Sequence, residues 1–168
     1  MLHEHDELAF DIGELLVARG EKVAVSETTA GGLISARMVS VAGASRWLES
    51  AILPYSGVHR FEALGIDRSA AGTSGSVSPS WVIATAEGLL RMTGVAWAVA
   101  ESGIAGPQTG RRSAKPAGSV AIAVIGPNGT ATEEHVFPGT RVEVMEAIAQ
   151  RVLEMLRERI TVAPRPNQ

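Results

Sequence analysis

The chain has 168 residues, of which 45% are hydrophobic and 20% are charged, and its formal net charge is −3 at pH 7. This length fits one globular domain of about 100–200 residues, and the absence of cysteine excludes disulfide scaffolds, thiol nucleophiles and cysteine-ligated metals. The mild negative charge and the lack of an apolar run of about 18 residues argue against a nucleic-acid partner and against a membrane span. Because the acidic start Met1–Glu7 lacks a basic signal-peptide region, we expect a cytoplasmic protein.

The N-terminal quarter predicts a helix, a strand and a second helix. Apolar residues recur at helical spacing between residues 8 and 16, and Gly20 occupies the expected helix end. The apolar stretch Lys22–Ser26 predicts a short buried strand. The next helix is expected to carry Leu33 and to end near Gly43.

The middle of the chain continues this alternation. Ala51–Tyr55 predicts a strand, and Pro54 indicates an edge strand or a strand end because proline has no amide donor. A short helix is expected over Val58–Leu64. A longer helix is expected over Ser78–Gly94, with serine as the cap and proline at the first helical position. Val95–Ala100 then predicts an apolar strand that stops at Glu101–Gly103.

The C-terminal third predicts a hairpin followed by a long helix. Ser119–Ile125 and Thr130–Phe137 flank Pro127–Gly129, a strong hairpin signal. The last helix covers about Arg141–Ile160 and leaves residues 161–168 as a flexible tail. Helices alternating with buried strands, plus one hairpin, predict a single-domain α/β sandwich with a mixed sheet over residues 1–168 and a core at about 5–160.

Two glycine-rich turns are the first candidates for a binding site. Glu27–Gly32 and Ser102–Pro107 each follow a predicted strand, so both are expected at the carboxyl edge of the sheet, where ligands bind in open α/β folds. A helix that begins at Gly31 and Gly32 offers free amides and the positive dipole end to a phosphate or an oxyanion. The alternative is that Glu27–Gly32 is only a tight strand-to-helix turn with threonine caps. The stretch matches neither a Walker loop nor a dinucleotide-binding fingerprint.

Among the other polar and aromatic residues, Arg141 is the one whose placement indicates a ligand contact. Arg141 opens the last helix, where a cation opposes the dipole at a cost of about 0.3–1 kcal/mol, and a ligand contact would explain that placement. The loop cations Arg111, Arg112 and Lys115 are interpreted as solvated. The histidines show no metal-ligand spacing, so we expect no metal and no cofactor. Core or interface positions are expected for the tryptophans Trp47, Trp81 and Trp97.

Six motifs, taken in order, resemble those of the C-terminal domain family of the competence/damage-inducible protein CinA. The family pattern runs approximately E-S-C-T-G-G, Y-S-N-x-x-K, G-A-V-S, T-G-I-A-G-P, K-P-x-G-T-V and F-P-G-x-R. The corresponding stretches of this chain are Glu27–Gly32, Tyr55–Arg60, Gly75–Ser78, Ser102–Pro107, Lys115–Val120 and Phe137–Arg141. The resemblance covers about residues 5–160, nearly the whole chain.

The resemblance implies hydrolysis of the carboxamide of nicotinamide mononucleotide, giving nicotinic acid mononucleotide and ammonia. It also implies a homo-oligomer, with Trp47 and Trp81 as candidates for the interface. The family's serine nucleophile corresponds to Thr28, and its assisting tyrosine and lysine correspond to Tyr55 and Arg60. The implied substrate-binding positions are Thr29, Ala30, Gly31, Gly32, Ser102, Gly103, Ile104, Gly106 and Arg141.

Several departures from the family pattern fall on the chemistry. Thr28 keeps a hydroxyl but is β-branched and turns less freely than serine. Arg60 stays protonated and cannot act as a base, as a buried lysine can. Gly57 replaces the family asparagine, and Ser102 replaces a threonine.

Two hypotheses follow from these departures. One is an amidohydrolase in which Thr28 attacks and Tyr55 or His59 handles protons. The other is a non-catalytic nucleotide- or phosphate-binding or regulatory homologue. A purely structural domain would leave the retained glycine turns unexplained.

Overall fold

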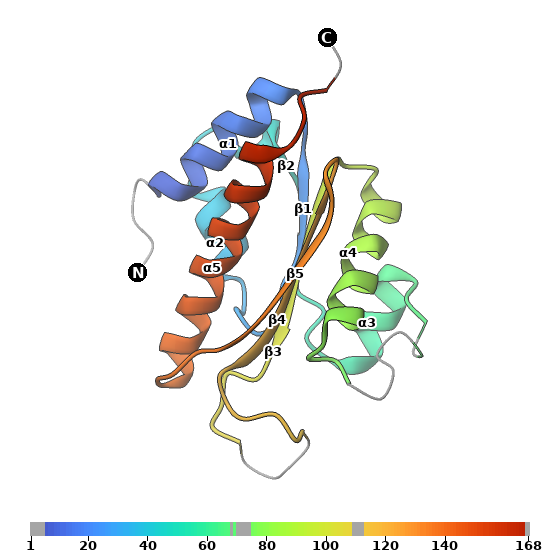
Figure 1. Ribbon diagram of the computed structural model, residues 1–168, viewed down its shortest axis with the longest axis vertical. Helices are drawn as coiled ribbons and strands as arrows, with labels where there is room; N and C mark the ends of the chain where they lie inside the picture. The colour runs from blue at the N-terminus through green and yellow to red at the C-terminus, as the bar shows by residue number, and fades with distance from the viewer. Residues whose placement is uncertain (1–5, 68, 70–74, 109–112, 167–168) are drawn as a thin grey trace.

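The computed structural model describes residues 6–67, 69, 75–108 and 113–166, and helices cover both faces of one five-stranded sheet (Figure 1). Only the backbone is described within the range 57–61, apart from His59. Arg111, Arg112, most of the loop after Asp67 and the last two residues of the tail therefore lie outside the described residues.

The sheet is mixed, as predicted. Its strands lie in the order β2-β1-β3-β4-β5. Strand β1 runs parallel to its neighbours β2 and β3, whereas β4 runs antiparallel to both β3 and β5. The strand bounds are β1 (Val23–Ser26), β2 (Leu48–Ile52), β3 (Trp97–Gly103), β4 (Ser119–Gly126) and β5 (Gly129–Val136).

Three helices lie on one face of the sheet and two on the other (Figure 1). The first group is α1 (Glu7–Arg19), α2 (Leu33–Val39) and α5 (Arg141–Val162), and the second is α3 (Gly57–Leu64) and α4 (Pro79–Thr93). A short 3-10 helix, η1 (Ala44–Arg46), precedes β2. Local signals account for several ends: Ser78 caps α4 by accepting from the amide of Trp81, and Thr140 forms a capping box with Glu143 at the start of α5.

The two faces of the sheet carry side chains of different size. On β3, Trp97 and Val99 belong to the core beneath α1, α2 and α5, whereas Ala98 and Ala100 belong to the core that includes α4. This alternation follows from the two-residue period of a strand. Trp47 and Trp81 are 1% and 3% exposed, so they pack inside this chain. Their burial agrees with the core positions expected for them and not with the interface role that the resemblance suggested.

Several boundaries differ from those predicted. Strand β3 runs over Trp97–Gly103 rather than 95–100, and α5 continues to Val162, so the helix includes the first two residues of the predicted tail. Strand β2 covers Leu48–Ile52 rather than 51–55, because it takes its register from β1, where Ser26 pairs with Ile52. The strand therefore ends before Pro54, and it lies at the sheet edge, as that proline indicated. Helix α2 ends at Val39 rather than near Gly43, and the chain then turns through Gly43 into η1.

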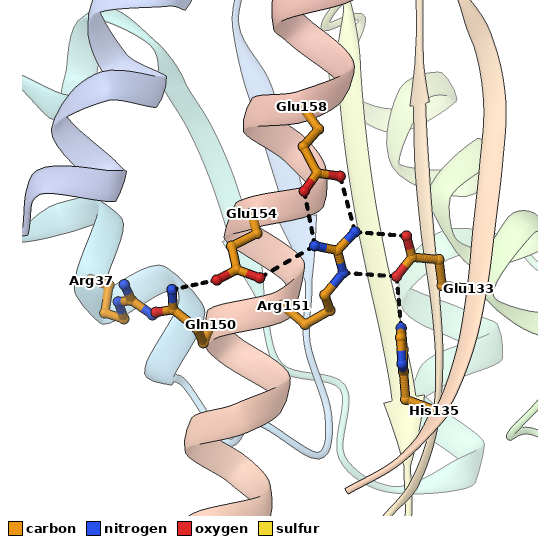
Figure 2. Close-up of polar contacts among 7 residues, drawn as sticks. All are labelled: Arg37, Glu133, His135, Gln150, Arg151, Glu154 and Glu158. Carbon is orange, nitrogen blue, oxygen red and sulfur yellow. Dashed lines mark hydrogen bonds and ion pairs between the residues drawn. The ribbon is translucent and has the colours of Figure 1, made fainter.

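An ion-pair network joins the edge strand β5 to α5 (Figure 2). The Arg151 guanidinium donates to Glu133 at 2.8 Å and to Glu158 at 2.9 and 3.0 Å. Glu154 accepts from the same guanidinium at 3.2 Å, and His135 lies 2.7 Å from Glu133. Hydrogen bonds with Arg151, and to a lesser degree His135, lower the pKa of Glu133 to about 2. This network fixes the outer strand of the hairpin against the long helix.

Candidate active site at the carboxyl ends of two parallel strands

The two glycine-rich stretches meet, as the sequence predicted. Strands β1 and β3 are parallel neighbours with Ser26 opposite Ala100, so their carboxyl ends adjoin. The turn Thr28–Ala30 leaves β1 and bonds directly to Glu101 on β3. The second stretch begins inside β3, because Ser102 and Gly103 still belong to the strand.

Glu101 is the residue that sequence reasoning missed. Its side chain is buried, and one carboxylate oxygen, Oε1, accepts from the amides of Thr28 at 2.6 Å and Ala30 at 2.9 Å. The other oxygen, Oε2, is buried and has no hydrogen-bond partner among the described residues. Burial raises the pKa of the Glu101 carboxyl above its usual value, while hydrogen bonds from Ala30, Thr28 and Thr29 act in the opposite direction.

Thr28 is held against β3 through both its backbone and its side chain. The residue is 4% exposed, and its Oγ1 donates to the backbone carbonyl of Glu101 at 2.9 Å. Its amide donates to the carboxylate of the same glutamate. The Thr28 hydroxyl, which the resemblance implies as the nucleophile, is therefore fixed at the junction of the two strands.

The amides that were expected to be free for an anion are bound to a second buried carboxylate. Glu27 accepts from the amides of Gly32 at 2.9 Å, Ile34 at 3.1 Å and Ser35 at 2.9 Å, and also from the Ser35 hydroxyl. A helix start leaves amides without intrahelical partners and favours negative charge, so a carboxylate satisfies it well. The expectation of open amides at the start of α2 is corrected here, because the chain's own Glu27 occupies them.

Glycines permit the close packing of these turns. Gly31 and Gly32 have φ of 68° and 98°, in the left-handed region where a side chain is strained. Gly103 has a different reason: a Cβ there would lie 2.6 Å from the Ser119 carbonyl oxygen and 3.2 Å from Oγ1 of Thr29. Thr29 and β4 thus pack closely against β3 at Gly103, where there is no side chain.

A second polar group forms at the start of α5. The Arg141 guanidinium donates to the Gly106 carbonyl at 2.8 Å and to the Tyr55 hydroxyl at 3.1 Å. Three predicted site residues from different segments are thereby joined: Tyr55 after β2, Gly106 after β3, and Arg141 at the first position of α5. These contacts explain why an arginine opens a helix whose dipole it opposes. The Tyr55 side chain itself is largely exposed.

The remaining predicted residues lie on several different segments of the chain. Arg60 lies on α3, but its side chain is outside the described residues. His59 is exposed on the same helix and pairs with Glu62 at 3.6 Å. Ala30 and Ser102 are buried, and Ile104 bonds through its backbone to Ser119 and Gly118. Lys115 forms an ion pair with Glu134.

The described part of the chain contains neither a cluster of metal-ligating side chains nor a helix of membrane-spanning character. Within residues 6–67, 69, 75–108 and 113–166, no three His, Asp or Glu side chains are grouped as a metal site requires. Over the same ranges, no helix has the length and apolar character needed to cross a membrane.

Curated relatives match most of this chain in sequence. A "CinA-like protein" of Anaeromyxobacter dehalogenans strain 2CP-C is 38% identical over 152 residues, covering 90% of this chain and 37% of the relative. A "CinA-like protein" of Syntrophobacter fumaroxidans is 37% identical over 145 residues, covering 86% of this chain and 34% of the relative. The chain thus spans little more than a third of the length of these relatives.

Solved structures share the fold over nearly their whole length. The competence/damage inducible protein CihA of Agrobacterium tumefaciens superposes with a TM-score of 0.85 at 30% identity, covering 93% of this chain and 96% of that one. The competence damage-inducible protein A (ComA) of Klebsiella pneumoniae gives a TM-score of 0.87 at 26% identity, with the same coverage. The model of the CinA C-terminal domain matches residues 5–160, the span that contains both glycine-rich stretches and Arg141. Sequence and fold thus agree that the chain belongs to the CinA C-terminal domain family.

Proposed function

We propose that this chain is an amidohydrolase that acts on nicotinamide mononucleotide or a related nucleotide amide and releases ammonia. The observation that carries the proposal is the position of Thr28. Its hydroxyl occupies the family's nucleophile position and is fixed 2.9 Å from the Glu101 carbonyl at the carboxyl end of β1. Ligands of open α/β sheets bind at this edge.

In the proposed reaction, Thr28 Oγ1 attacks the carboxamide carbon, and its proton leaves to a nearby acceptor. The carbon–nitrogen bond then breaks, the departing nitrogen gains a proton and ammonia is released. Water hydrolyses the resulting ester to give the nucleotide carboxylate and restores the Thr28 hydroxyl. Tyr55 and His59 are the candidate proton carriers, and the Tyr55 hydroxyl oxygen already accepts a hydrogen bond from Arg141.

Arg141 is the proposed contact for the substrate phosphate. Its guanidinium reaches toward Gly106 and Tyr55, two other positions that the resemblance assigns to the site. A planar guanidinium suits bidentate binding of a phosphate and keeps its charge at every pH of interest. The resemblance further implies a homo-oligomer, which light scattering in solution would test.

A second candidate function is nucleotide or phosphate binding without hydrolysis. Two buried carboxylates, Glu27 and Glu101, already bind the amides of the turn. Because these amides are then not open to the oxyanion of a hydrolytic reaction, the arrangement favours this second candidate. The arginine at the family's lysine position favours it too, since arginine cannot accept a proton.

One pair of measurements separates these candidates. Ammonia release from nicotinamide mononucleotide is measured with the purified chain and with Thr28→Val, which keeps the β-branched shape but removes the hydroxyl. Calorimetry on the same samples measures binding. Turnover that Thr28→Val abolishes supports the hydrolase, whereas binding of the nucleotide by both proteins without turnover supports the second candidate.

A further inference from the structure

The contacts of Glu101 Oε1 have the geometry of an occupied oxyanion hole. Two backbone amides converge on this single oxygen, from Thr28 at 2.6 Å and from Ala30 at 2.9 Å. Oxyanion holes hold one oxygen with amide donors at about 2.7–3.1 Å, a range that includes the Ala30 contact and begins just above the Thr28 contact. In serine proteases of the chymotrypsin type, one of those donors is the amide of the nucleophile itself. Here one donor belongs to Thr28, the proposed nucleophile.

The neighbouring carboxylate, Glu27, shows what a purely structural role looks like in the same turn. Glu27 uses both of its oxygens: Oε2 accepts from Gly32 and Ile34, and Oε1 accepts from Ser35. Glu101 uses only Oε1, and its Oε2 is buried without a partner among the described residues. A buried polar atom without a partner is costly, so Glu101 carries an energetic cost that Glu27 avoids.

The hydroxyl of Thr28 binds the same residue as this pair of amides. It donates to the backbone carbonyl of Glu101, while the amide of Thr28 donates to the Glu101 carboxylate. The nucleophile and the two amides are thus gathered around one residue of β3. A substrate oxygen that developed negative charge next to Thr28 would need the position that Glu101 Oε1 occupies.

We propose that the amides of Thr28 and Ala30 form an anion site that Glu101 fills from within the chain, and that this carboxylate closes the site to the oxyanion of a substrate. The ligand class is a small carboxylate or an equivalent oxyanion. The inhibitory part of the proposal rests on the proposed hydrolase function, whereas the anion site itself does not.

The anion site is tested with Glu101→Ala and formate, which carries the carboxylate that the variant lacks. Thermal unfolding of the full chain is followed while sodium formate replaces sodium chloride at constant ionic strength. We expect saturable stabilisation of Glu101→Ala, with a midpoint rise of roughly 3–6 °C at about ten times the dissociation constant. A linear or absent response would overturn the proposal.

Two control variants show whether the response belongs to the amide pair. Val99→Ala removes a buried side chain from the same strand and the same face but leaves an apolar space without amides. Glu101→Gln keeps an oxygen on the amides of Thr28 and Ala30. Neither variant should respond to formate. An equal response in Val99→Ala would show a general salt effect and would contradict the site.

A spectroscopic comparison keeps the test decisive if Glu101→Ala does not fold. Amide protons bound to a carboxylate resonate at lower field than those bound to a neutral oxygen. In Glu101→Gln, the amide protons of Thr28 and Ala30 should therefore move upfield, whereas those of Gly32 and Ile34, held by Glu27, should stay in place. Unmoved Thr28 and Ala30 resonances would refute the carboxylate contact.

Ammonia release separates the inhibitory role from the proposed function. Loss of one oxyanion donor costs hydrolases about 10²–10³-fold, so opening two donors in Glu101→Ala should raise turnover of nicotinamide mononucleotide by at least about tenfold. Formate should reverse the gain. Lower turnover in Glu101→Ala than in the unmodified chain would overturn the inhibitory role. Formate binding with no turnover in either protein would reject the hydrolase function and leave the anion site supported.

Discussion

Thr28 and Glu101 contact each other twice: the Glu101 carboxylate accepts from the Thr28 amide at 2.6 Å, and the Glu101 carbonyl accepts from the Thr28 hydroxyl at 2.9 Å. These two bonds join the turn after β1 to the end of β3. Because both residues are buried, the bonds are shielded from competition by water. The pair therefore fixes the position of the hydroxyl on which the proposed chemistry depends.

The free energy of unfolding should depend on pH through the titration of Glu101. Burial raises the folded pKa of this carboxyl above its usual value of 4.5, so the neutral form favours folding. That contribution is fully present below about pH 4.5 and is lost as the pH rises through the folded pKa. Glu101→Gln cannot ionise, so urea unfolding between pH 4 and pH 8 should show its stability gaining on the unmodified chain as the pH rises. Parallel profiles for the two proteins would contradict the raised pKa.

The network around Arg151 should give the opposite pH dependence. The folded pKa of Glu133 is lowered from 4.5 to about 2, so its charged form favours folding. The contribution is present above pH 4.5 and is lost as the pH falls toward about 2. Arg151→Met should cost about 1 kcal/mol of unfolding free energy at pH 7 and much less near pH 2.

Arg157→Met is the matched control for that prediction. Arg157 lies on the same helix and pairs with Asp11 at 3.2 Å, but both side chains are about half exposed, at 43% and 53%. Its removal should change the unfolding free energy by no more than about 0.5 kcal/mol. An equal loss in both variants would mean that the network of Figure 2 adds nothing beyond a single surface pair.

The sequence predicted those features of the fold that depend on local signals. Ser78 and Gly94 bracket α4, and the strands on either side of Pro127 form a hairpin. Caps and turns act within a few residues, so they are readable without knowledge of the rest of the chain. The position of β2 was less accurate because its register depends on β1, more than twenty residues away.

The candidate site was predicted in outline but not in its electrostatics. The glycine turns and Arg141 were found from the motifs, whereas Glu101 was interpreted only as part of a strand end. An acid after the apolar run Trp97–Ala100 does indicate such an end, and its burial depends on packing from β1 and β4, which the sequence does not display. The role of Glu27 was missed for another reason. It lies five residues before Gly32, the N-cap of α2, and so outside the usual capping position.

Binding of nicotinamide mononucleotide should depend on Arg141 through the phosphate. Arg141→Met removes a charge-assisted contact, and such contacts are worth about 1.5–3 kcal/mol, so the nucleotide should bind roughly tenfold to a hundredfold more weakly. Affinity for the riboside, which lacks the phosphate, should change little. Calorimetry with both ligands, and with Arg157→Met as a control, measures the difference. Equal losses for nucleotide and riboside would remove the phosphate role from Arg141.

The packing around Gly103 should not tolerate a side chain. In Gly103→Ala, the new Cβ would lie 2.6 Å from the Ser119 carbonyl oxygen, so β3 and β4 would have to separate. Overpacking of this kind costs about 1–3 kcal/mol, which chemical denaturation would detect. Because Thr29 also contacts this point, ligand affinity should fall along with stability. Unchanged stability would show that the two strands can yield at their carboxyl end.

The rate of ammonia release from nicotinamide mononucleotide tests most directly whether the Thr28 turn is the reaction centre. The measurement compares the unmodified chain with Thr28→Val and with the double variant Thr28→Ser, Arg60→Lys, which restores the family's serine and lysine. A positioned general base is worth about 10²–10⁴-fold, so the double variant should release ammonia faster than the unmodified chain, and Thr28→Val should release none. Turnover that survives Thr28→Val, or a double variant no faster than the unmodified chain, would contradict this assignment of the nucleophile and of the missing base.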